Sequence, residues 1–578
     1  MATIQARKSR GHKYWYIVES RRVNGKPRPV MLAYLGKADD LLCKLQSGLD
    51  KFQFKSYSHG AVAALLKTAA ELDVCSTINA HINSCRKHMA KKPVRNNITA
   101  GLTFLLAAIG RVCMPTSKDA WYDWAKTTSL EYLLRSNFSK LDSQHFWDMM
   151  DALPVEAIEK IEETLVKRAF HIHDLDKESL FFDTTNFFTY INSTNEKCTI
   201  AKRGKNKQKR GDLRQVGLAM AVTQNDMIPI FHLTYQGNMN DTKVFSSIVE
   251  KLKNRLIALN LDIEKHTIVF DRGNNSKQNL ELLEQAKLHY VGALTPYHHR
   301  DLVMDATKHW ELQNINGEEL LIYRDQRIIW NRERTVIVFI SDKLKSGQIR
   351  GIHQSQQKAE NLLSKLQKSL QNPKAKKRKK ENLEATIKKV LQKQFITNVF
   401  DWSLEEIVEG SYRLHYSVDQ LKLREIEEQM GFRIIMTDRH EWETADIIKT
   451  YYGQAHIEHT FKNLKNPYHL AIRPQFHWTD QKIAVHFFIC VMGYLLSAIT
   501  WRQVKMDKTF NRSLDTLLDK LNNIRLMCGV ETAKTPAKIK VTYKLEEMVE
   551  EDKHILEDLK IHDFHSVRPK ICGVGVYI

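Results

Sequence analysis

Three carboxylates in this sequence stand in positions that suit a pair of divalent metal ions. Asp183 ends the apolar run Leu-Phe-Phe-Asp, Asp271 ends a second run, Ile-Val-Phe-Asp, and Glu458 comes much later in a segment with helical periodicity. Carboxylate oxygens suit Mg²⁺ or Mn²⁺. Two such ions about 4 Å apart can activate water or a 3′-hydroxyl and stabilise the leaving oxygen in phosphoryl transfer. We predict that all three carboxylates are catalytic, bind both ions and lie within roughly 4–7 Å of a common point.

Each aspartate also has a purely structural interpretation. Asp183 precedes Thr-Thr-Asn and Asp271 precedes Arg-Gly-Asn-Asn, and an aspartate in such a setting is a good turn or cap residue. Neither motif is specific by itself. Their joint placement after short apolar runs, in a strongly basic chain, favours the metal-binding interpretation.

Glu458 lies in a stripe of basic and hydrogen-bonding side chains. A helix over residues 451–465, at about 100° per residue, places five polar side chains within an arc of roughly 80°: Tyr451, Gln454, Glu458, Lys462 and Lys465. The adjacent arc is apolar and contains Ile457, Phe461 and Leu464. One face therefore suits a core, and the other suits a metal and DNA phosphates. The alternative is an ordinary amphipathic helix with a mixed-charge solvent face.

The charge of the chain favours a polyanionic partner. Its 578 residues carry a formal net charge of +21, with a pI near 9.4, which indicates nucleic acid first and an acidic membrane surface second. Eight cysteines without a CxxC pair are typical of reduced thiols, not of a disulfide framework or a zinc site. No signal-peptide pattern follows Met1, so we expect a cytoplasmic protein.

One apolar run, Ile483–Trp501, is long enough to be tested as a membrane span. It stands alone and contains polar residues such as His486 and Thr500. We interpret it as a buried helix and expect no membrane partner.

A chain of this length needs more than one core. Asn24-Gly25 between alternating apolar runs predicts a β-hairpin region over residues 1–50, and residues 51–175 show helical periodicity with basic loops, which suits a DNA-binding region. Residues 176–297 predict a mixed α/β sheet. Residues 298–430 resemble an α/β insertion with a long polar helical pair. Residues 431–502 return to the sheet and supply the Glu458 helix, and residues 503–578 form a C-terminal region.

Other candidate DNA contacts are less specific. A basic run between the first two strands of the sheet contains Lys202, Arg203, Lys205, Lys207, Lys209 and Arg210, and a merely solvated loop is an equally good interpretation. Arg272 follows Asp271 and could touch DNA or pair with an acid. His477 and His486 could serve the site, and Trp330 and Trp478 could stack on an unpaired base; for each of these four, packing is the simpler interpretation.

Taken together, these motifs resemble a known family. The segments Phe182-Asp183-Thr-Thr, Val269-Phe-Asp271-Arg-Gly and Tyr451-x2-Gln454-x3-Glu458-x6-Lys465 are similar to those of the DDE transposases of bacterial insertion sequences, in the group called insertion sequence family four. The downstream segment Leu470-Ala-Ile-Arg473-Pro474-x2-His477-Trp and the N-terminal Tyr14-Trp-Tyr-Ile-Val resemble one of its subgroups. The resemblance covers most of residues 12–500.

The resemblance implies an RNase H-like catalytic core interrupted by an insertion before the last catalytic helix. It implies that Asp183, Asp271 and Glu458 hold two Mg²⁺ or Mn²⁺ ions, and that Tyr451, Lys465 and Arg473 lie along the DNA. Members bind double-stranded DNA at terminal inverted repeats as homodimers, cut the 3′ strands and join them to target DNA. A bacterial, nucleoid-associated location follows from the same resemblance.

The sequence departs from the family signature at one position, where Gln454 stands in place of arginine. Glutamine can hydrogen-bond a phosphate but has neither the charge nor the planar fork of a guanidinium. Two alternatives therefore remain open. One is a catalytically weakened or domesticated transposase that acts as a sequence-specific DNA-binding protein, and the other is a stand-alone RNase H-like nuclease.

Overall fold

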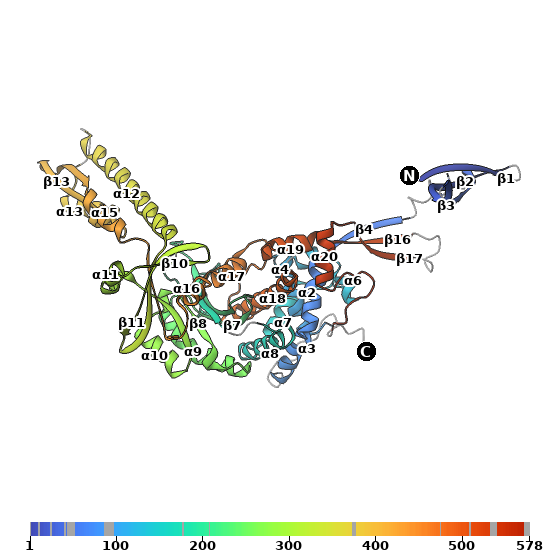
Figure 1. Cartoon of the computed structure of the whole chain (residues 1–578), viewed down its shortest axis with the longest axis horizontal. Coiled ribbons are helices and arrows are strands. Elements are labelled where there is room, and N and C mark those ends of the chain that lie inside the picture. Colours follow the sequence, from blue (N-terminus) through green and yellow to red (C-terminus); the bar gives the residue numbers. More distant parts are fainter. Residues whose placement is uncertain are drawn as a thin grey trace.

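The structure is a computed structural model that describes residues 2–9, 12–23, 26–39, 42, 52–85, 98–175, 179–206, 208–372, 377–473, 475–507, 510–531 and 540–571. Figure 1 shows a central body with a mixed sheet on one side and a group of helices on the other. A small lobe projects from the sheet end, and a separate N-terminal sheet projects from the helical end.

A nine-stranded mixed α/β sheet forms one half of the body, in the order β10-β11-β12-β15-β9-β8-β5-β6-β7. Its inner strands are β5 (Ser179–Thr189), β6 (Arg214–Thr223), β7 (Pro229–Gln236), β8 (Thr267–Val269), β9 (His289–Leu294) and β15 (Phe432–Thr437). Only the β5–β8 and β8–β9 pairs are parallel. The continuous apolar run of β6 is buried along its length, as expected for a strand covered on both faces.

The predicted strands and helices are confirmed within the described part of residues 176–297, with two corrections. Asp183 does not end its strand, because β5 continues to Thr189, and Asp271 lies beyond its strand, because β8 ends at Val269. The helices are α9 (Asp241–Ala258) and α10 (Lys277–Gln285), with short turns η2 (Ile263–Lys265), η3 (Arg272–Asn274) and η4 (Pro296–His298). Ser276 caps α10 as predicted, since its side chain accepts a hydrogen bond from the backbone of Asn279 at 3.1 Å.

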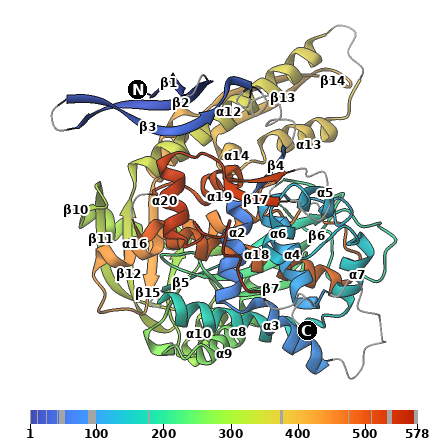
Figure 2. The same cartoon turned by 90° about the vertical axis from the view of Figure 1, so that its right-hand side faces the viewer.

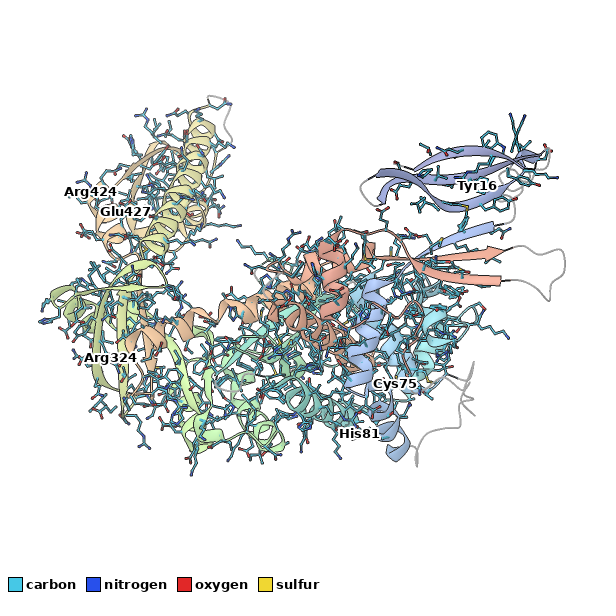
Figure 3. All side chains as sticks on the ribbon, turned by 45° about the vertical axis from the view of Figure 1, so that its right-hand side comes forward. Tyr16, Cys75, His81, Arg324, Arg424 and Glu427 are labelled. Carbon is cyan, nitrogen blue, oxygen red and sulfur yellow. The ribbon has the colours of Figure 1, made fainter. Side chains whose placement is uncertain are left out.

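Residues 298–430 contain two different structures. The strands β10 (Glu311–Ile315), β11 (Glu318–Ile329) and β12 (Arg332–Ile340) extend the central sheet, beside α11 (Arg300–Lys308). The lobe that follows has its own core, made by α12 (Asp342–Gln371), α13 (Lys380–Leu391), α14 (Ile396–Val399), β13 (Phe400–Val408), β14 (Ser411–Val418) and α15 (Gln420–Glu428). The predicted helical pair is therefore confirmed as α12 and α13. Arg424 and Glu427 mark this lobe in Figure 3.

The other half of the body is helical and is built around one long helix, α18 (Asp480–Met506). Around it lie α2 (Gly60–Glu71), α3 (Val74–Cys85), α4 (Ala100–Cys113), α5 (Trp121–Ala125), α6 (Leu130–Leu134), α7 (Ser143–Asp151) and α8 (Val155–His173). Helices α2, α4 and α8 contact α18 directly, as does strand β7. Figure 2 shows α18 enclosed by these elements.

Helix α18 is long and apolar enough to cross a membrane by length and composition, and its most apolar window is entirely buried inside the protein. Twenty-one of its twenty-seven residues are buried. The helical half and the sheet thus share a single hydrophobic core.

A buried polar network joins the helical half to the sheet. Glu162 of α8 lies 2.5 Å from Nδ1 of His232 on β7 and 3.3 Å from Nη1 of Arg255 on α9. Burial alone would raise the pKa of Glu162, but His232 and Arg255 hold it below its usual value. Because all three side chains are buried, the network fixes the register of α8 against the sheet.

Two small antiparallel sheets complete the chain. The predicted hairpin is confirmed as β2 (His12–Val23) and β3 (Lys26–Gly36), joined by β1 (Ala2–Ser9); its turn, Asn24-Gly25, lies outside the described residues. Strand β4 (Phe52–Ser58) pairs with β16 (Arg525–Glu531), which pairs with β17 (Lys540–Leu545). Helices α19 (Leu514–Asn523) and α20 (Glu550–Asp558) lie nearby. The remaining helices, α16 (Thr444–Tyr452) and α17 (Ala455–Lys465), lie between the sheet and α18.

Candidate active site

The two aspartates follow the paired part of two neighbouring parallel strands. Phe181 of β5 is paired with Val269 of β8, and this is the last pair of that ladder. Asp183 lies two residues further along β5, and Asp271 lies two residues beyond the end of β8. The Phe270 amide still donates to the Val291 carbonyl of β9 at 3.2 Å, and the backbone of Asp271 is extended.

Helix α17 covers the face of β5 that carries Asp183. Near its start, the His456 ring lies 5.7 Å from the Phe181 ring, and at its end Lys465 Nζ donates a hydrogen bond to Thr185 Oγ1. From His456 to Lys465 the helix advances about 13.5 Å, and from Phe181 to Thr185 the strand advances about 13 Å. The two elements therefore run side by side in the same direction.

In this alignment Glu458 comes two residues after His456 on α17, and Asp183 comes two residues after Phe181 on β5. Side chains alternate along a strand, so Phe181, Asp183 and Thr185 all face α17. Ile457 and Leu464 are fully buried and hold α17 against the core, whereas Glu458 is exposed. The approach of Glu458 to the two aspartates stays a prediction.

The close approach of helix and strand depends on Gly453. A Cβ atom at this position would lie 2.4 Å from Cζ of Phe181, which is far inside the normal carbon–carbon contact distance. The same position interrupts the helix that the sequence predicts over 451–465, because α16 ends at Tyr452 and α17 begins at Ala455. A lone glycine within a helical pattern is a signal for such an approach, but its partner could not be identified from the sequence.

Tyr451 is only 5% exposed and lies inside the site instead of on its surface. Burial raises the pKa of its hydroxyl, with an opposing contribution from Arg433 and a further increase from the charge of Asp271. The Arg433 guanidinium lies 6.0 Å from the centre of the Tyr451 ring. Arg433, on β15, was not among the predicted site residues, and it brings a cation to the Asp271 side of the site.

The chemistry of the donors suits Mg²⁺ or Mn²⁺. Oδ1 of Asp183 and Oδ1 of Asp271 each accept a hydrogen bond at 2.7 Å from the amide of the next residue, Thr184 and Arg272 respectively, which steadies both carboxylates. Within the described ranges, however, no three His, Cys, Asp or Glu side chains stand close enough together to hold a metal ion. The predicted convergence of three carboxylates therefore stays a prediction, resting on backbone placement.

The predicted DNA contacts fall into two groups. Lys462 and Arg272 are exposed, while Gln454, Lys465 and Arg473 are half-buried. In the basic loop between β5 and β6, five cations are exposed and Lys207 lies outside the described residues: Lys202, Arg203, Lys205, Lys209 and Arg210. Arg210 is already paired with Asp212 at 2.6 Å. The loop is anchored to the start of α18, because the Asp480 carboxylate accepts from the backbone of Thr199 and Ile200 at 2.8 and 3.1 Å.

His477 and His486 do not lie among the carboxylates. Their rings stack on each other at 4.2 Å, and His486 Nε2 lies 2.8 Å from the backbone oxygen of Ile472. Both face the helical half of the body, where they line a pocket. Trp330 packs partly buried against the main core, and Trp478 is exposed.

Comparison with known proteins agrees with this arrangement. The model of the transposase DDE domain matches residues 176–496, more than half of the chain. The chain belongs to the DDE transposase family. The matched range begins just before β5 and ends within α18, so it spans every element that positions Asp183, Asp271 and Glu458.

The N-terminal comparison corrects the subgroup. Residues 2–52 match the N-terminal domain of the IS1634 family of transposases, which is not the insertion sequence family four that the signature suggested. Both are families of DDE transposases. The correction is consistent with Gln454, since a signature taken from one family need not hold at every position of another.

No curated protein matches the chain. Among solved structures, the chain is similar to the piggyBac transposase in a synaptic complex with hairpin DNA, at 10% identity and a TM-score of 0.38, over 81% of this chain and 82% of that one.

Proposed function

We propose that the protein is a DNA transposase that cuts the ends of its insertion sequence and joins them to target DNA. The observation that carries this proposal is that Asp183 and Asp271 each come two residues after the last paired residues of the parallel strands β5 and β8, and that α17, which bears Glu458, packs on β5. In this proposal the inner strands β7-β6-β5-β8-β9 are an RNase H-like core. The family match supports the reaction class.

The three carboxylates would hold two Mg²⁺ or Mn²⁺ ions, which when bound supply an activated nucleophile and charge stabilisation for phosphoryl transfer. The protein's own residues place the DNA strand. Lys462 and Arg272 are exposed cations close in sequence to Glu458 and Asp271 respectively, and they suit phosphate contacts. Lys465 is held by Thr185, so it offers a positioned charge.

Sequence-specific binding needs a larger surface than this site. We propose that the helical region and the basic loop bind the terminal inverted repeats, and that two copies act together as a homodimer on paired ends. The exposed cations of the loop, anchored beside α18, support this role, because phosphate contacts supply much of the affinity of DNA-binding proteins.

The test is strand cleavage and joining. A linear duplex containing the DNA that flanks the coding sequence on each side is incubated with the full chain, Mg²⁺ or Mn²⁺, and a supercoiled target plasmid. We expect metal-dependent nicks at the element ends and joined products, both absent for Asp183→Asn and Asp271→Asn. Cleavage that does not depend on the end sequence, with no joining, would indicate a stand-alone nuclease instead.

Gln454 supports a second candidate, a weakened transposase that binds ends without cutting them. Its amide lies at the turn between α16 and α17 and is half-buried. If this candidate is right, the native chain binds the ends and does not nick them, and Gln454→Arg restores nicking. If the native chain already cuts, Gln454→Arg changes the rate by at most a few fold.

A further inference from the structure

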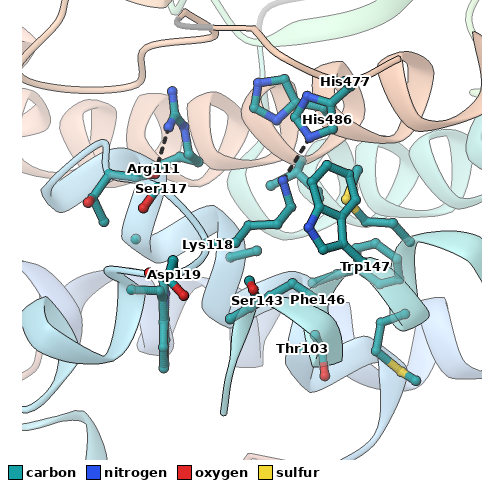
Figure 4. Close-up of a pocket in the computed structure, with 18 of the residues that line it drawn as sticks. Thr103, Arg111, Ser117, Lys118, Asp119, Ser143, Phe146, Trp147, His477 and His486 are labelled. Carbon is teal, nitrogen blue, oxygen red and sulfur yellow. Dashed lines mark hydrogen bonds between the residues drawn. The ribbon is translucent and has the colours of Figure 1, made fainter. Parts of the chain in front are cut away.

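A pocket of about 360 Å³ lies between the helical half and the start of α18, in a region that the proposed chemistry does not use. Figure 4 shows its lining, with Trp147 beside His477, whose ring centre is 5.1 Å away, and with Thr103 and Phe146 lower in the view. Most of its lining is apolar, with the aromatic side chains Phe104, Trp121, Phe146, Trp147 and Phe476. Its volume lies within the range of about 300–1,000 Å³ that small-molecule sites occupy.

One wall of the pocket carries cations without matching carboxylates. Lys118 Nζ lies 2.7 Å from Nε2 of His477, and Arg111 donates to the backbone oxygens of Thr116 and Arg473, each at 3.2 Å. Within the described part of the chain, neither cation forms an ion pair, and Asp119 of the lining is exposed. The wall is therefore net positive.

His477 cannot neutralise Lys118. The imidazole is 4% exposed, and burial, together with the neighbouring His486, holds its pKa well below the usual value. The neutral ring accepts from Lys118 at Nε2, which assigns its proton to Nδ1. That Nδ1 is buried and has no hydrogen-bond partner among the described residues. The wall thus contains a half-buried ammonium whose hydrogen-bond partner is a neutral imidazole, and an anion in the pocket would stabilise it.

Exposed aromatic rings and a cation lie close to one lining residue of the pocket. Phe476 lines the pocket and is 59% exposed, and its ring lies 5.6 Å from that of Tyr190, just after β5. Trp478, two residues further along the chain, is also exposed and has Lys197 Nζ 5.1 Å from its ring centre. Exposed aromatic rings beside cations form the kind of surface that unpaired nucleotides bind.

From these observations we propose that the pocket binds a single nucleotide, with the base among the aromatic side chains and the phosphate on Lys118 and Arg111. The aromatic side chains of the pocket suit a planar base, and the cations on one wall suit the phosphate attached to it. The pocket lies beyond the end of β5, and Thr189 is about 20 Å along the strand from Asp183, so this site is separate from the carboxylates. The nucleotide is either a free mononucleotide or an unpaired nucleotide of a DNA strand.

The experiment uses the full chain without divalent metal and two probes. The first is deoxyadenosine monophosphate, titrated by calorimetry, with deoxyadenosine and inorganic phosphate as partial ligands. The second is a 30-base-pair duplex with one unpaired 2-aminopurine, whose fluorescence reports whether the base enters an aromatic site. Two variants change different parts of the pocket. Lys118→Met removes the charge of the lysine, and Ala107→Phe fills the apolar part of the cavity. Lys126→Met removes an exposed lysine of the same helical half that is paired with Asp123, and serves as the matched control.

We expect at least one probe to bind, with affinity reduced about tenfold or more by Lys118→Met, as for a lost charge-assisted hydrogen bond, and also reduced by Ala107→Phe. Lys126→Met should have no effect on pocket binding. Binding of the mononucleotide identifies a free ligand, and a fluorescence change with the duplex alone identifies a DNA strand. If neither probe binds, or if binding is unchanged in both pocket variants, the proposal is wrong. Since no metal is present, a failure to cleave DNA would not affect this result.

Discussion

Replacing Gly453 with alanine tests whether the contact between α17 and β5 positions Glu458. The added Cβ would lie 2.4 Å from Cζ of Phe181, and carbon atoms normally pack at about 3.5–4.0 Å. Phe181 is fully buried, so the separation must grow by roughly 1–1.5 Å through movement of the helix. Overpacking of this kind costs about 1–3 kcal/mol, and a misplacement of about 1 Å can cost roughly 100-fold in rate.

We expect Gly453→Ala to retain binding to the element ends while strand cleavage falls by about two orders of magnitude. Phe181→Leu shortens the side chain that the new methyl group meets. The double variant should therefore recover most of the lost rate, with a coupling energy of about 1–3 kcal/mol between the two positions. Cleavage rates are measured at saturating DNA for the wild type, the two single variants and the double variant, and DNA binding is measured separately. The four rates give the coupling energy.

Gly347→Ala is the matched control, because a Cβ at Gly347 on α12 meets nothing within 4 Å. That substitution should leave cleavage unchanged and stabilise the helix by up to about 1 kcal/mol. Wild-type cleavage by Gly453→Ala, or a double variant no better than Gly453→Ala alone, would refute the idea that this contact sets the position of Glu458.

Three further predictions concern stability, pH and salt. Glu162→Ala leaves Arg255 buried without its carboxylate, so urea unfolding should show a loss of about 3–5 kcal/mol, against little change for the exposed Glu159→Ala; equal losses would contradict the role of the network. Burial and nearby cations lower the pKa of Lys118 to about 8, so the ammonium is mostly present at pH 7 and about half lost at pH 8, and nucleotide affinity should fall about tenfold between pH 7 and 9; calorimetry with Lys118→Met should show no such fall. Lys462→Gln should weaken binding to any duplex and reduce the salt slope of log Kobs by about 1, and an unchanged slope would exclude a phosphate contact there.

Local patterns predicted several elements well. The alternation around Asn24-Gly25, the apolar runs before Asp183 and Asp271, and the cap at Ser276 each specify their own backbone, because the relevant interactions lie within a few residues. The proximity of Asp183 and Asp271 stays a prediction. The strand that lies beside β5 is decided by packing across the whole sheet, so neither motif alone could give the register between the two strands.

Features that depend on distant partners were not predicted. Gly453 and Phe181 are more than 250 residues apart, and nothing near either residue indicates the other. The pocket is lined by Lys118 and His477, which lie far apart in the sequence. Its charge and volume therefore exist only in the folded protein. The prediction of insertion sequence family four was wrong, because a signature of a few residues does not separate that family from the IS1634 family, which is also made of DDE transposases.

Helix α18 has a consequence for the way the chain is made. It supplies the inner wall for helices that begin at Gly60, yet it is complete only at Met506. At about 5–20 residues per second of synthesis, the first helices would emerge roughly 20–90 s before their partner. During that interval the apolar faces that pack on α18 in the folded protein are exposed. The nascent chain should therefore depend on chaperones, and prematurely terminated chains should aggregate instead of competing for DNA.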